Sequence, residues 1–157
     1  MITTPSTSQL VRSVSSQLRA KVLPAIADPA LVVEIEMMLS MLDMAAVRAG
    51  HEIAWMLQEA DGIDAALSDA AAAGELPELV LAALDALHAS QPADLTYPEV
   101  QRHYGLASEA LARVAEVAHA DGSRLQPLVW SLLEGRVEHE LATIGAYVAV
   151  GRSENQT

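Results

Sequence analysis

The chain of 157 residues contains no cysteine and no phenylalanine, and its aromatic side chains are two Trp and three Tyr. Without cysteine it forms no disulfide, has no thiol nucleophile and provides no thiolate ligand for zinc. A core must therefore be built from Leu, Val, Ile, Met and Ala. Because Ala is the best helix former and β-branched residues are not abundant, the composition predicts helices and not a sheet.

Positive charge is also scarce, since nine Lys and Arg stand against 21 Asp and Glu, giving a formal net charge of −12. Such a chain repels nucleic acids and anionic membrane surfaces, so we expect neither as a partner. It has no apolar run of ~20 residues and no cationic start followed by an apolar segment. We expect a cytoplasmic protein with one domain, 1–157, and frayed ends at 1–7 and 152–157.

What the sequence does contain is a series of helix caps, apolar stripes with a 3.6-residue period and short breakers. No segment alternates with a period of two, so we expect an all-α fold, an antiparallel bundle of four main helices with one or two short ones. Breaks are expected at Asp61-Gly62 and, as a break or bend, at Gly105. The expected helices cover 8–23, 28–60, 63–73, 77–89, 96–104, 106–120 and 125–150.

Three of these helices have a long apolar stripe that we expect to face the core. In the first helix the stripe is Leu10, Val14, Leu18 and Val22. In the long second helix it is Leu31, Ile35, Met38, Leu42, Ala45 and Ala49, continued by Ile53, Met56 and Ala60. In the last helix it is Trp130, Leu133, Val137, Leu141, Ile144 and Val148.

Motifs of catalysis are not found. His51-Glu52 begins like the H-E-x-x-H helix of zinc proteases, but the position of the second histidine holds Trp55. Phosphate-binding glycine loops and the G-x-S-x-G nucleophile elbow are missing as well. We therefore expect no catalytic residues, and the protein is more readily interpreted as a non-enzyme.

Helical bundles can hold two metals with Glu-x-x-His pairs. Glu116 and His119 form one such pair, and Asp85 and His88 form a shorter imitation. On a helical wheel both pairs point away from the apolar side of their helices. We expect no metal and no cofactor, with a ferritin-like metal-binding oxidoreductase as an alternative.

The last helix has a second apolar face, made by Leu125, Leu128, Val129 and Leu132. Polar side chains continue this face toward the C-terminus and are candidates for binding a ligand: Arg136, His139, Thr143 and Tyr147. Arg136 could bind a carboxylate and His139 could act as a base. The same pattern also arises where a helix emerges into solvent at the end of a bundle.

On the long helix, Met37, Met44 and Trp55 lie on an apolar strip separate from the main stripe. Another helix of the chain, a second copy or a small ligand could cover this strip. Because the segment 63–73 has few large side chains, we expect a homodimer that uses these three residues, since symmetric pairs are the commonest assemblies.

Two stretches within the first 60 residues resemble known proteins. One has the pattern L-x-x-x-V-x-x-x-L-x-x-x-V-L-P-A-I from Leu10 to Ile26, and the other runs from Met38 through His51-Glu52 to Trp55. They are similar to small uncharacterised helical proteins of actinobacteria, often encoded near aminoglycoside-phosphotransferase-like proteins and acyl-CoA dehydrogenases. The resemblance implies a bacterial accessory protein and identifies no catalytic residue.

The sequence thus favours a non-catalytic helical protein that self-associates or serves as an accessory to an enzyme, whose identity it does not indicate. The alternatives are the metal-binding oxidoreductase and a binder of a small acyl or aromatic ligand in the bundle interior.

Overall fold

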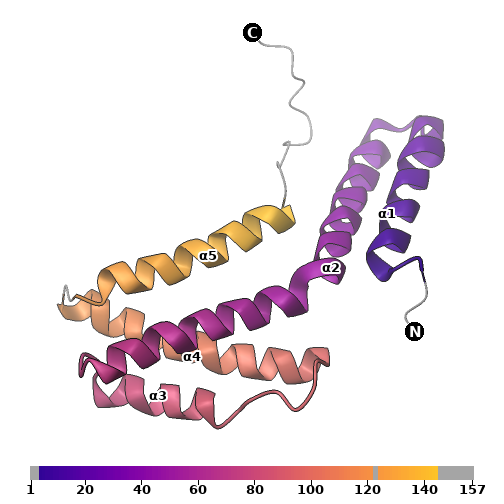
Figure 1. Ribbon diagram of the computed structural model, residues 1–157. Coiled ribbons are helices and arrows are strands. Elements are labelled where there is room, and N and C mark those ends of the chain that lie inside the picture. The colour runs from indigo at the N-terminus through magenta and orange to yellow at the C-terminus, as the bar shows by residue number, and fades with distance from the viewer. Residues whose placement is uncertain (1–3, 122–123, 145–157) are drawn as a thin grey trace. The chain divides into compact units, whose positions relative to one another are not determined.

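The computed structural model describes residues 4–121 and 124–144, of which 85% are helical and none forms a strand. The all-α class predicted from the sequence is confirmed. No helix in these residues is both long and apolar enough to cross a bilayer. The elements are α1 (Thr7–Gln17), a π-helical turn (Leu18–Val22), a 3-10 turn (Leu23–Ala25), α2 (Pro29–Ala72), α3 (Glu78–His88), α4 (Tyr97–Asp121) and α5 (Gln126–Ile144) (Figure 1).

The chain divides into two compact units. The first unit comprises Met1–Glu52 and Glu140–Thr157, and the second comprises Ile53–His139. The boundaries fall inside α2 and α5. Of the ends that we expect to fray, 1–3 and 152–157 lie outside the described residues, as do Tyr147 and Val148.

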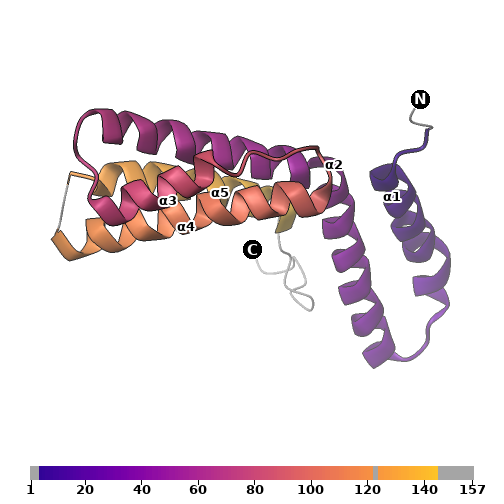
Figure 2. The ribbon, with the colours of Figure 1, turned by 90° about the horizontal axis from the view of Figure 1, so that it is seen from below.

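In the second unit, the C-terminal part of α2 lies beside α3, α4 and α5 (Figures 1 and 2). All four segments contribute to one hydrophobic core. Its largest buried members are Ile63, Leu67, Leu76, Val80, Leu84, Leu87, Leu111, Val114, Leu125 and Val129. The alanines of α4 at 107, 110 and 118 are also buried, which allows neighbouring helices to approach closely. This is the part of the fold that positions the candidate site.

The break predicted at Asp61-Gly62 is wrong, because α2 is continuous from Pro29 to Ala72. α4 likewise continues through Gly105. A glycine inside a helix costs only about 1 kcal/mol relative to alanine, and burial of Ile63 and Leu67 outweighs that cost.

α2 ends at Ala72, one residue before the predicted end, and the predicted stop residue Gly74 follows in the turn. This residue has φ +71°, and its N–H donates to the Ala71 carbonyl while Glu75 N–H donates to the Ala70 carbonyl. Glycine adopts such a left-handed conformation without steric cost and commonly terminates helices. Pro77 then caps α3.

In the first unit, α1 packs beside the N-terminal part of α2 through small and polar side chains. Ser8 Oγ donates to the Ala46 carbonyl at 2.7 Å, and Ser15 Oγ donates to Asp43 at 2.7 Å. Arg19 pairs with the same carboxylate at 3.0 Å. Burial acts to raise the pKa of Asp43, but the bonds from Ser15 and Arg19 outweigh it and lower the pKa.

This packing contradicts the inward face predicted for α1 and for the N-terminal part of α2, whereas Met56 and Ala60 of the same α2 stripe are buried as predicted. Leu10 and Val14 of α1 are about half exposed, and so are Leu31 and Met38 of α2. The side chains buried between the helices are instead Ser15, Leu39 and Ala46. Hydrogen bonds from serine hydroxyls favour the small-residue side of α1, and the larger apolar side chains are turned aside. The helix expected from residue 8 begins instead at Thr7, because Ser6 and Gln9 form a capping box.

α5 packs with the face that we considered secondary. Leu125 and Val129 are buried, whereas Trp130 and Val137 of the predicted main stripe are exposed. The reason is that the face with Leu125 and Val129 leads into polar side chains that find partners on other helices, as described next.

Candidate functional site

Glu59 of α2 is the centre of a polar cluster in the second unit. Its side chain is 12% exposed and is held by residues from two other helices. Tyr104 of α4 donates its hydroxyl to Oε2 at 2.7 Å, and His139 of α5 places Nδ1 2.7 Å from Oε1. Arg136 of α5 forms an ion pair, with Nε 3.2 Å from Oε2. A buried carboxylate requires such compensation, so Glu59 ties three helices together.

Arg136 is held by three kinds of contact. Its Nη2 donates to Ser108 Oγ at 2.7 Å, and its guanidinium lies 5.0 Å from the centre of the Tyr104 ring. The contact between Nε and Glu59 is electrostatic, because the buried Nε has no hydrogen-bond partner among the described residues. These contacts fix the direction of a long cationic side chain.

Trp55 lies one helical turn before Glu59 and stacks on His139, with ring centroids 4.9 Å apart and planes inclined by 14°. The imidazole is thus oriented by a carboxylate at its Nδ1 and by an indole on its face. Sequence reasoning assigned Trp55 to an interface. In the structure it makes this contact within the second unit.

Burial and the hydrogen bond to Glu59 raise the pKa of Tyr104 to about 12. An ordinary tyrosine titrates near pH 10. The folded state therefore favours the neutral phenol. The stability that this preference adds to the folded state is fully present below about pH 10 and is lost as the pH rises toward 12.

We therefore expect the phenolate absorbance of Tyr104, obtained as the difference between the parent and Tyr104→Phe, to appear near pH 12. In Glu59→Gln the midpoint should fall, because the acceptor no longer carries a charge that opposes ionisation. A Tyr104 midpoint unchanged by Glu59→Gln would show that the carboxylate does not hold the hydroxyl.

A pocket of about 160 Å³ adjoins this cluster. The apolar wall of the pocket is formed by the buried Ile63 together with Leu132. The polar wall is formed by Glu59, Arg136 and His139. The rim is exposed and consists of Gln58, Gly62, Ser131 and Glu138. We call this space the Glu59 pocket. All its walls belong to α2 and α5 of the second unit.

Two glycines in helix interiors, Gly62 of α2 and Gly135 of α5, line the Glu59 pocket. A Cβ added at either position would meet no atom within 4 Å. Neither a close helix contact nor a positive φ therefore requires glycine there. The glycines leave open space on two walls of the pocket.

The four ligand-binding residues predicted from the sequence belong to different parts of the chain. Arg136 and His139 are brought together on Glu59 and line the pocket. Thr143 is buried but belongs to the first unit, and Tyr147 lies outside the described residues. The sequence reasoning missed Glu59, Tyr104 and Ser108 as members of the site. The one available signal was a carboxylate one helical turn after Trp55.

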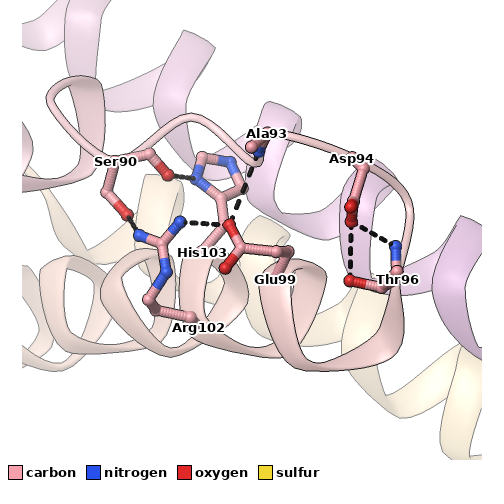
Figure 3. Close-up of polar contacts among 7 residues, drawn as sticks. All are labelled: Ser90, Ala93, Asp94, Thr96, Glu99, Arg102 and His103. Atoms are coloured by element: carbon pink, nitrogen blue, oxygen red, sulfur yellow. Dashed lines mark hydrogen bonds and ion pairs between the residues drawn. The ribbon is translucent and has the colours of Figure 1, made fainter.

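A second polar cluster anchors the loop between α3 and α4 (Figure 3). His103 is buried and donates from Nδ1 to the Ser90 carbonyl at 3.0 Å. Arg102 donates to the Ser90 hydroxyl and to Glu99, the latter at 2.7 Å. Asp94 accepts from the N–H and the hydroxyl of Thr96. This cluster satisfies the polar groups of the loop and lines no part of the Glu59 pocket.

The residues considered for a metal site remain on exposed helix faces. Glu116 pairs with Arg113 at 3.2 Å, and His119 is exposed. His88 pairs with Asp64 at 2.6 Å. Within residues 4–121 and 124–144, no three His, Asp or Glu side chains gather in a group that could hold a metal ion.

Comparison with known proteins adds no relative from which a role could be carried over: no family model, no curated protein and no solved structure matches this chain.

Proposed function

We propose that the protein is a non-catalytic binding protein whose second unit holds a small aromatic or acyl ligand in the Glu59 pocket. The observation that carries the proposal is the pocket itself, in which an apolar wall faces a preorganised polar wall. Pockets for small molecules characteristically combine apolar lining with a few convergent polar groups. We include in this proposal the role predicted from the sequence, that of an accessory to an enzyme.

The size of the pocket limits the ligand. Its volume of about 160 Å³ is close to that of an engineered apolar cavity that takes benzene, about 150 Å³. A single ring or a short acyl group fits such a space. Because Glu59 is neutralised by Arg136 while Glu138 adds negative charge at the rim, we infer that neutral ligands are preferred to anions.

The test uses benzyl alcohol as a neutral ring, butyramide as a neutral short chain and benzoate as the anionic counterpart of the ring. Probes of this size bind with a Kd on the order of 1 mM even in a fitted site. We expect benzyl alcohol or butyramide to raise the melting temperature of the full chain, with benzoate less effective. A melting temperature unaffected by all three would contradict the proposal.

The two pocket glycines provide a sharper variant of this test. We expect Gly62→Ala with Gly135→Ala to stabilise the protein by up to about 1 kcal/mol for each site, because alanine is the better helix former. The same methyl groups narrow the Glu59 pocket, so the effect of the probe on the melting temperature should shrink or disappear.

Gly105→Ala is the matched control for these variants. Gly105 is also inside a helix and has open space at its Cβ, but it does not line the pocket. It should give a similar gain in stability with an undiminished response to the probe. If the double variant responded like Gly105→Ala, the probe would bind elsewhere.

A further inference from the structure

The hairpin of α1 and the N-terminal part of α2 leaves one of its broad faces uncovered. The two apolar stripes that we expected to face the core both lie on this side, because the helices contact each other through Ser8, Ser15, Asp43 and Ala46. Helical spacing of 100° per residue places both stripes to the same side of that contact. We call this the hairpin face, made by Leu10, Val14, Leu18, Leu31, Ile35, Met38 and Leu42.

Exposure on the hairpin face is high for side chains of this kind. Leu10 is 53%, Val14 52% and Met38 58% exposed, while Leu18, Ile35 and Leu42 are half-buried. By contrast, few large apolar side chains are buried in the contact between the two helices. Leu39 is one of them. A contiguous exposed apolar surface of this kind marks an interaction site.

The charges of the hairpin show which partner fits. Residues 7–25, which contain α1, carry Arg12, Arg19 and Lys21 and no acidic residue. The part of α2 from 29 to 47 carries Glu34, Glu36 and Asp43 and no basic residue. Among the described residues Arg19 pairs with Asp43, and Arg12 also acts electrostatically on that carboxylate. In the described part of the hairpin, the charges left without an ionic partner are Lys21, Glu34 and Glu36.

We propose that the hairpin face binds the same face of a second copy of this chain, with α1 of one copy against the acidic part of α2 of the other. A two-fold axis makes both such contacts at once, because α1 of the first copy then meets α2 of the second while α1 of the second copy meets α2 of the first. The pairing forms four helices around a new apolar core. Packing α1 against the other α1 would instead bring like charges together.

This proposal keeps the homodimer expected from the sequence and changes the surface that it uses. The sequence reasoning placed the dimer on Met37, Met44 and Trp55 because it assumed that the stripe with Met38 was covered within the chain. The structure leaves Leu31 and Met38 of that stripe exposed, and it stacks Trp55 on His139. Met37 lies on another side of α2 and is 50% exposed, so it supplies a control.

The experiment measures the mass of the full chain by light scattering during size-exclusion chromatography at tens of micromolar. We expect twice the chain mass of 16.6 kDa. Met38→Glu should give monomer, with dissociation at least tenfold more favourable, while circular dichroism retains the helix content. Met37→Glu, the same change at the adjacent position, which is 50% exposed against 58% for Met38, should remain dimeric.

A second measurement locates the contact without disturbing it. The chain has no cysteine, so Ser13→Cys, at an exposed position of α1 outside the hairpin face, accepts a single spin label. We expect dipolar coupling between labels of two copies, and its loss on dilution with unlabelled protein.

A monomeric native chain, a dimer that survives Met38→Glu or labels without coupling would overturn the proposal. A chain that is monomeric in buffer and adsorbs to lipid vesicles through Met38 would overturn it in favour of a lipid surface. None of these outcomes bears on ligand binding in the Glu59 pocket, which belongs to the other unit.

Discussion

Replacing Glu59 with alanine is expected to lower the free energy of unfolding of the second unit by about 3 kcal/mol. The substitution leaves Arg136 with a largely buried charge and no carboxylate, and it removes the acceptor of the Tyr104 hydroxyl. Removing one member of a buried ionic group costs more than the group itself contributes, because the remaining charge stays desolvated. Arg136 and His139 are 24% and 20% exposed, which places the expected value at the low end of the range for buried pairs.

The measurement is chemical denaturation followed by circular dichroism, with Glu109→Ala as the control. Glu109 is also a helical glutamate paired with an arginine, but its side chain is 53% exposed. Solvent screens such a pair, so we expect no measurable loss of stability there. If the two variants were equally stable, Glu59 would not be the centre of the cluster.

The second large effect is expected at Leu67, where substitution by alanine should also cost about 3 kcal/mol. Leu67 is completely buried in the core shared by α2, α3, α4 and α5. The substitution removes the Cγ methine and both Cδ methyl groups, so it loses their transfer from water and leaves a cavity that close-packed helices fill only in part.

Leu95→Ala is the comparison for Leu67, because Leu95 precedes α4 and is 66% exposed. Its truncation should change the unfolding free energy by less than about 0.5 kcal/mol. A loss of stability in Leu67→Ala no greater than in Leu95→Ala would mean that the core is not closed around Leu67.

Sequence patterns predicted the core of the second unit well where large apolar residues recur with helical spacing. The positions that helical spacing places inward are buried on α4 (Leu111, Val114 and Ala118) and mostly buried on α3 (Val80, Leu84 and Leu87), where Leu79, also placed inward by the pattern, is 55% exposed. On these helices one face is clearly more apolar than the others, so burial has a single favourable solution.

The patterns failed where two faces compete. α1 turns Ser15 inward instead of Leu10, because a serine hydroxyl can satisfy Asp43 while small side chains let the helices approach. α5 buries Val129 instead of Trp130, because the same face leads to Arg136 and its partner on α2. Such choices depend on which groups a neighbouring helix presents, and helical periodicity carries no information about that.

For a related reason, the sequence predicted only the part of the candidate site that lies on α5. Arg136 and His139 continue an apolar stripe, which is a local pattern on one helix. Glu59 is 80 residues before His139 in the chain, and only tertiary packing brings the two together. Sequence spacing indicates that a polar wall exists, but it does not indicate which carboxylate completes it.

The most direct measurement of the central proposal is a titration of the full chain with benzyl alcohol, followed through the methyl resonances of its isoleucines and leucines. Ile63 and Leu132 line the Glu59 pocket, whereas Leu79 and Leu95 are exposed elsewhere in the same unit. Binding in the pocket predicts saturable shifts at Ile63 and Leu132 that are lost in Gly62→Ala with Gly135→Ala and kept in Gly105→Ala. Saturable shifts confined to Leu79, Leu95 or other exposed methyl groups, or no shift at all, would contradict it.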